Sequence, residues 1–222
     1  PSLLFFYIHS MDSGKLITFE GLDGCGKSTQ LEKATDWLKE QGCSVLKTCQ
    51  PGGTVIGKQI RKILLNPEHE ELQPESELLL YLADRIQHLY DSILPAKASG
   101  TIVLCDRFHD STVAYQGYGR GLNLKCIESI VAHCIKPYLP DLTILLNISL
   151  ETVASRLEHR QELVKKDRLD LESSSFFKRV ALGFQELAAA EPERFVCING
   201  EQDIEVIHQE IINILQQRLQ LS

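Results

Sequence analysis

No two cysteines of this chain stand at the C-x-x-C spacing, although it contains seven of them. Its seven histidines are just as scattered, so neither residue type shows the spacing of a structural zinc site. An odd number of cysteines is also a poor basis for a disulfide framework. We therefore expect free thiols, as in proteins of a reducing compartment, and predict a cytoplasmic location.

The chain also lacks an excess of basic residues and a long hydrophobic run. Its 23 lysines and arginines against 30 aspartates and glutamates give a formal net charge of −7, which argues against a dedicated nucleic-acid-binding protein. The apolar run at residues 3–8 is too short for a membrane span and lacks the flanks of a signal peptide. We expect neither a nucleic acid nor a membrane as partner.

The only methionine is Met11. We therefore interpret residues 1–10 as a non-native or disordered extension and place a single domain over residues 11–222. Within that range no repeat, low-complexity tract or linker interrupts the sequence. A chain of this length is ample for one sizeable core.

Five short apolar runs alternate with longer stretches of helical periodicity. We predict strands at 16–19, 44–47, 101–105, 142–146 and 195–198, and helices at 29–41, 55–65, 75–98, 123–135, 150–162 and 203–219. Short apolar strands separated by helices are typical of a parallel sheet that is covered on both faces. The pattern predicts an α/β protein with a three-layer α/β/α architecture, whose ligands bind at the carboxyl ends of the strands.

The segment after the first strand matches the phosphate-binding pattern G-x-x-x-x-G-K-[ST]. Glycines let the backbone wrap a phosphate, Lys27 reaches the β- and γ-phosphates, and the Ser28 hydroxyl binds Mg²⁺. The match lies between a predicted strand and a predicted helix, as this chemistry requires. We predict an ATP site formed by Gly21, Leu22, Asp23, Gly24, Cys25, Gly26, Lys27, Ser28 and Thr29.

Asp106 ends the third predicted strand. A carboxylate at this place can hold Mg²⁺ through water, although a strand-end cap is the simpler reading of the residue alone. We predict Ser28 and Asp106 as the metal site. The guanine-reading pattern N-K-x-D is absent from the sequence.

Several further segments resemble thymidylate kinases. They are residues 19–30 around the P-loop, P-G-G-T at 51–54, L-L-Y-L-A-D-R at 79–85, D-R-F at 106–108, S-T at 111–112, A-Y-Q at 114–116 and P-D-L-T at 140–143. The resemblance runs in order from about residue 16 to the last helix. It implies a P-loop nucleotide kinase fold with a mobile lid, transfer of the γ-phosphoryl group of ATP to dTMP for dTTP synthesis, and a homodimer.

The resemblance also implies roles for single residues. Tyr81 would stack on thymine, where the family commonly has Phe, and Arg85 would bond the carbonyl edge of the base. Arg107 would bind the acceptor phosphate, and Tyr115 would close against the sugar 2′ position. The implied dTMP-binding residues are Asp23, Tyr81, Arg85, Arg107, Ser111, Thr112, Tyr115, Gln116 and Asp170. Taken alone, the aromatic residues also fit core packing and the charged residues fit surface pairs.

Residues 156–172 alternate basic and acidic side chains. By itself this is the pattern of a solvated helix face, but the stretch stands where nucleotide kinases place a lid that excludes water on closing. The P-loop carries no arginine, so the chain resembles the bacterial-type kinases with lid arginines. We predict Lys27, Arg107, Arg160 and Arg168 as catalytic residues. The family's D-R-x-E reads D-R-L-D at 167–170 here, which leaves Glu172 as an alternative to Asp170.

One segment departs from the family, because Cys49 and Gln50 replace an Arg-Glu pair. Two other functions therefore stay open. A deoxynucleoside kinase would need a general base such as Glu20 or Asp106, since its acceptor is a neutral hydroxyl, whereas an anionic phosphate acceptor needs none. A P-loop module that binds ATP without catalysis is the other.

Overall fold

The computed structural model describes residues 14–135, 138–161 and 167–221. For residues 157–161 it describes the backbone only. Five parallel strands form one sheet in the order β2-β3-β1-β4-β5. Each predicted strand is confirmed, with small shifts of its ends: β1 Leu16–Glu20, β2 Val45–Cys49, β3 Ile102–Asp106, β4 Leu142–Asn147 and β5 Phe195–Asn199. The order places β1, which precedes the P-loop, at the centre of the sheet.

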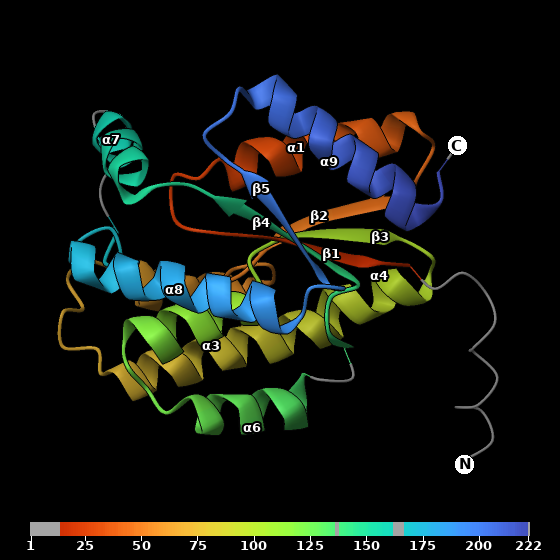
Figure 1. The fold of residues 1–222 in the computed structure, drawn as a ribbon. Helices are drawn as coiled ribbons and strands as arrows, with labels where there is room; N and C mark the ends of the chain where they lie inside the picture. The colour runs from red at the N-terminus through yellow and green to blue at the C-terminus, as the bar shows by residue number, and fades with distance from the viewer. Residues whose placement is uncertain (1–13, 136–137, 162–166, 222) are drawn as a thin grey trace, which may run out of the picture.

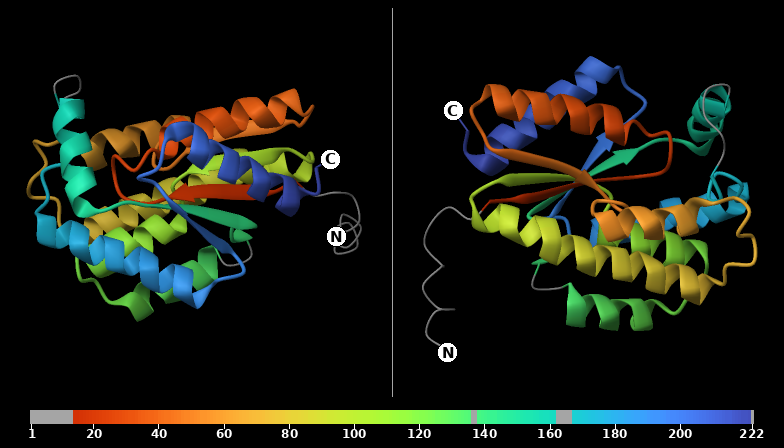
Figure 2. Two further views of the ribbon diagram at one scale, coloured as in Figure 1. Left: turned by 45° about the horizontal axis from the view of Figure 1, so that its top comes forward. Right: turned by 180° about the vertical axis from the view of Figure 1, so that it is seen from behind.

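Helices cover both faces of the sheet, as the three-layer prediction requires (Figure 1). α1 and α9 lie side by side on one face, and α3, α6 and α8 lie on the other. α7 stands apart from both layers, beyond the carboxyl end of β4 (Figure 2). The bounds are α1 Lys27–Glu40, α2 Val55–Leu65, α3 Pro74–His88, α4 Leu94–Ala98, α5 His109–Thr112, α6 Leu124–Cys134, α7 Leu150–Gln161, α8 Ser174–Ala190 and α9 Ile204–Leu219.

Alternation along β1 divides the core between the two faces. Ile17 and Phe19 pack toward α1 and α9, whereas Leu16 packs toward α3, because successive side chains of a strand point to opposite faces. All five residues of β1 are buried. None of the helices in the described ranges combines the length and the apolar character that a membrane crossing requires.

The helix predicted over 75–98 is interrupted by a π-helical turn, η1, at Leu89–Ile93. Pro95 follows this turn and has no N–H to donate to a preceding carbonyl, so the altered turn fits its presence. A second π-helical stretch, η2, spans Val113–Gly119 and continues α5. Such turns are frequent at functional sites, since they bring neighbouring residues onto one side of a helix.

Two helical segments were not predicted. α8 has a sequence signal, because Ser173 caps it and Phe176, Val180 and Phe184 repeat at helical spacing. The stretch of α5 and η2 has no comparable signal. Its glycines weaken helical propensity, and it is held instead by close packing: a Cβ added at Gly119 would stand only 2.7 Å from the Phe176 ring of α8.

Candidate active site

The P-loop lies between the end of β1 and the start of α1. Gly21, Gly24 and Gly26 all have positive φ angles, which glycine adopts without strain. At Gly21 a Cβ would also stand 2.5 Å from the carbonyl oxygen of Leu146 on β4. Only glycine fits there, so the sequence dictates the tight turn that aims the start of α1 into the site.

Lys27 is buried in the P-loop. Its ammonium donates hydrogen bonds to the carbonyl oxygens of Leu22, at 2.8 Å, and Gly21, at 3.1 Å. It also contacts the Cys25 sulfur at 3.6 Å. An ammonium held by loop carbonyls is poised over the space that the loop encloses. A large cleft lies along the P-loop, but Gly21, Leu22 and Cys25 do not line it; they shape the loop and hold Lys27.

Ser28 and Asp106, the predicted metal site, lie together. The Ser28 hydroxyl donates to Asp106 Oδ2 at 2.9 Å. Both are hard oxygen donors, which suits Mg²⁺, an ion that keeps several waters and takes few protein ligands. Accordingly, no larger cluster of His, Cys, Asp and Glu in the described part of the chain could hold a metal ion.

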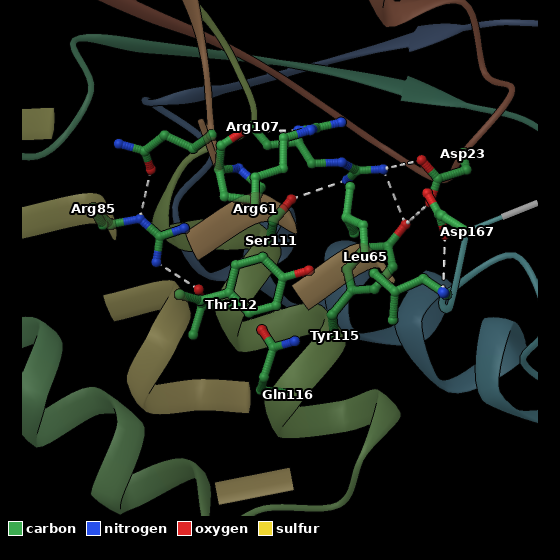
Figure 3. Close-up of a pocket in the computed structure, with 14 residues that line it drawn as sticks. Asp23, Arg61, Leu65, Arg85, Arg107, Ser111, Thr112, Tyr115, Gln116 and Asp167 are labelled. Atoms are coloured by element: carbon green, nitrogen blue, oxygen red, sulfur yellow. Dashed lines mark hydrogen bonds and ion pairs between the residues drawn. The ribbon is translucent and has the colours of Figure 1, made fainter. Parts of the chain in front are cut away.

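A cavity opens beside the P-loop (Figure 3). Its walls come from the P-loop, α2, α3, the loop after β2, and the α5–η2 stretch. All the predicted dTMP-binding residues except Asp170 line it: Asp23, Tyr81, Arg85, Arg107, Ser111, Thr112, Tyr115 and Gln116. Ser111, Thr112, Tyr115 and Gln116 reach it together because α5 and η2 present them on one side.

Arg107 stands where this cavity meets the larger cleft of the P-loop, and it lines both. Its guanidinium donates to Asp23 Oδ1 at 2.9 Å, Ser111 Oγ at 3.0 Å and Tyr115 Oη at 3.1 Å. Its backbone is left-handed, with φ of 68°. A non-glycine residue pays about 1–2 kcal/mol for that conformation, a cost that tends to persist only at functional positions.

Asp23 and Arg107 form an ion pair that is the electrostatic centre of the site. Burial opposes both charges. The Arg107 and Lys27 charges nevertheless hold the pKa of Asp23 well below its usual range, and the Asp23 carboxylate raises the pKa of Arg107 well above its own. The Tyr115 hydroxyl donates to Asp23 Oδ2 at 2.9 Å. Both residues stay ionised at neutral pH, so Arg107 places a cation, paired with Asp23, between the two cavities.

Glu20, at the end of β1, braces the chain around Arg107. It accepts hydrogen bonds from the backbone N–H of Phe108 at 2.7 Å and from Ser111 Oγ at 2.6 Å. Burial and the nearby Asp110 carboxylate raise the pKa of Glu20 to about 7. Both of its oxygens are engaged and it is fully buried, so it is in no position to serve as a general base.

Gln50 belongs to a series of hydrogen bonds that links Arg85 to His88 and Thr48. Arg85 Nε donates to Gln50 Oε1 at 2.8 Å, so Gln50 Nε2 must donate to His88 Nδ1 at 2.9 Å. His88 Nε2 then donates to Thr48 Oγ1 at 2.8 Å. Burial and the Arg85 charge lower the pKa of His88 to about 4. The imidazole is therefore neutral, and every bond in the chain is satisfied without a carboxylate.

These hydrogen bonds explain how the site accommodates glutamine at position 50. They also lead to a prediction. Gln50→Glu, which restores the family's acid, is expected to raise the pKa of His88 from about 4 toward 6.5 or above, because the carboxylate stabilises an imidazolium at Nδ1. With its depressed pKa, His88 costs the wild type stability as pH falls from about 6.5 toward 4, since the unfolded chain takes up that proton first. The variant should lose less stability there.

The measurement is a pH titration of the histidine ring signals by NMR, with thermal melts at pH 7 and pH 5. His109 provides an internal control, because it is buried with a pKa of about 4 and no hydrogen bond joins it to residue 50. A pKa change of both histidines in the variant, or of neither, would contradict the proposed series of hydrogen bonds.

The structure also adds residues that sequence reasoning missed. Arg61 of α2 lines both cavities and donates to the carbonyl oxygen of Pro51 at 2.7 Å. Asp167 lines both cavities as well, at the end of the predicted lid. Arg61 sits on an amphipathic helix one turn after Gly57, and its sequence context gives no sign that distinguishes it from other exposed basic residues.

The predicted lid, residues 156–172, is described in part. Arg156 donates to the carbonyl oxygens of Gly24, at 3.2 Å, and Gly200, at 3.1 Å, so it bridges the P-loop and the loop after β5. The side chain of Arg160 lies outside the described residues. Arg168 is buried and pairs with Glu77 of α3. The Asp170 carboxylate accepts from the backbone N–H of Asp167 at 3.1 Å.

A central P-loop and an adjoining cavity with a fixed cation at their junction define a phosphotransferase of the nucleotide kinase class. The profile of the thymidylate kinase family matches residues 19–211. This chain belongs to the thymidylate kinase family.

Related proteins and a solved structure agree with the profile. A thymidylate kinase of Exiguobacterium sp. is 43% identical over 208 residues, which cover 94% of this chain and 97% of that protein. One from Pelotomaculum thermopropionicum is 40% identical over 206 residues, 93% of this chain and 94% of that protein. The crystal structure of thymidylate kinase from Ehrlichia chaffeensis superposes with a TM-score of 0.74 at 33% identity, covering 92% of this chain and 99% of that one.

Proposed function

We propose that this chain transfers the γ-phosphoryl group of ATP to dTMP, giving ADP and dTDP. The observation that carries the proposal is the position of Arg107, which lines both the P-loop cleft and the adjoining cavity. A guanidinium at that junction can bind an acceptor phosphate through paired hydrogen bonds while the donor lies along the P-loop. Membership of the thymidylate kinase family supports thymine as the base.

The chemistry asks for alignment and charge neutralisation rather than proton removal. A monophosphate is already anionic near neutral pH, so its oxygen attacks without a base. Lys27 would bind the β- and γ-phosphates, and Arg107 would hold the acceptor phosphate in line with them. The two cations offset the repulsion between the reacting phosphates.

Ser28 and Asp106 would hold Mg²⁺. When bound, the ion would neutralise charge on the β- and γ-phosphates. The 2.9 Å hydrogen bond between the two residues supports this assignment, because it shows their oxygens at one place.

The base and sugar would lie deeper in the cavity. Tyr81 would stack on thymine, Arg85 and Thr112 would meet its carbonyl edge, and Tyr115 would crowd the 2′ position so that deoxyribose is preferred. Tyr115 is fixed for this role by its hydrogen bonds with Asp23 and Arg107. The contribution of Asp170 to dTMP binding and the catalytic roles of Arg160 and Arg168 stay predictions.

The test is ATP consumption with Mg²⁺ and, in parallel, dTMP, dUMP, dCMP, AMP or thymidine as acceptor. We expect strong turnover with dTMP, weaker turnover with dUMP and none with thymidine. Turnover with thymidine alone would contradict the proposal and indicate a hydroxyl acceptor. ATP binding without turnover on any acceptor would indicate a binding module instead.

We further propose a single domain over residues 11–222, with its lid at about 156–172, that assembles as a homodimer in the cytoplasm. Leu79 of α3 and Tyr90 of η1 support the dimer, because they are large apolar side chains left 61% and 57% exposed. We expect a dimeric mass by light scattering at micromolar concentration, and a lower mass for Leu79→Glu. A monomeric wild type would contradict the proposed assembly.

A further inference from the structure

Gln116 of η2 stands between the acceptor cavity and a buried carboxylate. Its side chain lines the cavity, as Figure 3 shows. On its other side, Gln116 Nε2 donates to Glu77 Oε1 at 2.7 Å. Glu77 belongs to the first turn of α3, is fully buried and does not line the cavity. The hydrogen bond to Gln116 is therefore a direct link between Glu77 and the lining of the cavity.

An ionised carboxylate can only accept hydrogen bonds. The NH₂ group of Gln116 must therefore be the one that faces Glu77, and the amide oxygen is left for the cavity. Burial alone would raise the pKa of Glu77, but the hydrogen bonds and charge of Arg120 lower it, helped by Gln116 and Arg168. Glu77 is thus ionised at neutral pH. The Gln116 amide therefore has one orientation, with its NH₂ group toward Glu77.

Glu77 itself is prevented from turning. Arg120 donates to both of its oxygens, from Nε to Oε1 at 3.2 Å and from NH2 to Oε2 at 3.0 Å. Arg168 donates to Oε2 as well. Paired contacts of this kind fix a carboxylate in direction as well as in place. The clamp also joins two parts of the molecule, since Arg168 lies in the predicted lid.

We propose that Glu77 is a positioning residue for base selection: it holds the Gln116 amide so that an acceptor oxygen faces the base. Thymine presents an N–H donor at N3, whereas cytosine presents an acceptor there and an amino donor at C4. The fixed oxygen of Gln116 favours thymine or uracil and repels cytosine. Arg85 adds to the selection, because its guanidinium offers only donors. The inference rests on the proposed function.

The test is Glu77→Gln. This substitution keeps the size of the side chain but no longer fixes the orientation of the Gln116 amide. A glutamine at position 77 can donate to Gln116 Oε1 as well as accept from Nε2, so the Gln116 amide can turn its NH₂ to the base. We expect the ratio of kcat/KM for dTMP to that for dCMP to fall about tenfold or more, as one misdirected hydrogen bond would cause. KM for ATP should not change.

Glu191→Gln is the control for the loss of a carboxylate. Glu191 pairs with an arginine as well, Arg194, at 2.8 Å, but it lines neither of the two cavities and has no hydrogen bond to Gln116. The variant removes the same charge, and we expect it to leave the dTMP to dCMP ratio unchanged. A second control is Glu77→Gln in a Gln116→Leu background, where no amide remains to be turned. There the substitution should not alter the ratio further.

The variant leaves Arg120 and Arg168 facing a neutral side chain, and this could unfold the protein. A charge-balanced variant, Glu77→Gln with Arg168→Gln, keeps the Arg120–Glu172 pair and covers that case. An unchanged ratio in a folded Glu77→Gln protein, or an equal fall in Glu191→Gln, would overturn the inference. The ratio of dissociation constants for dTMP and dCMP, measured by calorimetry, tests base selection separately from turnover. It therefore distinguishes a failure of the Glu77 proposal from a failure of the proposed kinase function. Retained selectivity of binding without turnover in the wild type would count against the proposed function alone.

Discussion

Arg107→Met is expected to lower kcat/KM for dTMP by about 10³-fold while leaving ATP binding nearly unchanged. The guanidinium is the cation shared by the two cavities, and methionine fills its volume without a charge or a donor. Two charge-assisted hydrogen bonds to a phosphate account for a loss of this size. The measurement is steady-state kinetics at varied dTMP and saturating ATP, with nucleotide binding followed separately.

Two further variants sharpen this prediction. Arg107→Lys keeps the charge but loses the paired geometry, so it should recover only part of the activity. Arg218→Met controls for the loss of an arginine elsewhere, because Arg218 lies on α9, donates to the Glu193 carbonyl oxygen at 2.9 Å and lines neither cavity. If Arg107→Met turned over dTMP as the wild type does, the acceptor phosphate would have to bind elsewhere, for example at Arg61, which also lines both cavities.

Asp23 contributes to the activity loss that is expected for Arg107→Met. It is the ion-pair partner of Arg107, and removal of the guanidinium leaves its carboxylate half-buried beside Lys27. Part of the measured loss therefore reflects an uncompensated charge rather than a missing contact. Arg107→Met combined with Asp23→Asn removes both charges. If the double variant is more active than the single one, the uncompensated carboxylate accounts for part of the loss.

The sheet and the P-loop were predictable because local signals determine them. Buried parallel strands read as short apolar runs, and β1 is apolar enough to be found even though it carries Thr18 and Glu20. The phosphate loop is predictable for a different reason, since glycine positions and Lys27 are set by backbone geometry. These features depend on residues that are close in sequence.

The acceptor pocket is different, because its order comes from contacts between distant segments. Asp23 and Arg107 were placed there only by family resemblance, and nothing in the spacing of these two residues predicts their ion pair. Glu77 and His88 were not predicted at all, and each acts through a partner on another element: Gln116 of η2 and Gln50 after β2. A buried polar residue within an amphipathic helix gives no local sign of its partner.

The replacement of Arg-Glu by Cys49 and Gln50 shows the same limit. From the sequence it threatens catalysis, because an acid and a base disappear beside the acceptor site. In the structure Gln50 bonds Arg85 and His88, and Arg61 supplies a cation that lines both cavities. The departure is therefore compatible with the proposed activity.

Lys27→Met is expected to lower kcat by about 10³-fold or more, because its ammonium is the P-loop cation that would stabilise charge developing on the transferred phosphoryl group. In the structure that ammonium is held by the carbonyl oxygens of Gly21 and Leu22, so it must leave them when a triphosphate binds. Methionine makes no such bonds. We therefore expect the variant to fold with a P-loop that has lost internal hydrogen bonds.

Lys33→Met provides the matched control, since Lys33 lies on the same helix and pairs with Glu205 at 3.0 Å on the surface. It should retain full activity, because an exposed pair contributes at most about 1 kcal/mol to stability and touches neither cavity. Thermal melts and ATP binding separate damage to the loop from loss of chemistry. A Lys27→Met protein that binds ATP but has normal kcat would contradict the assignment, and the charge on the phosphates would then have to be offset by Arg107 and the lid alone.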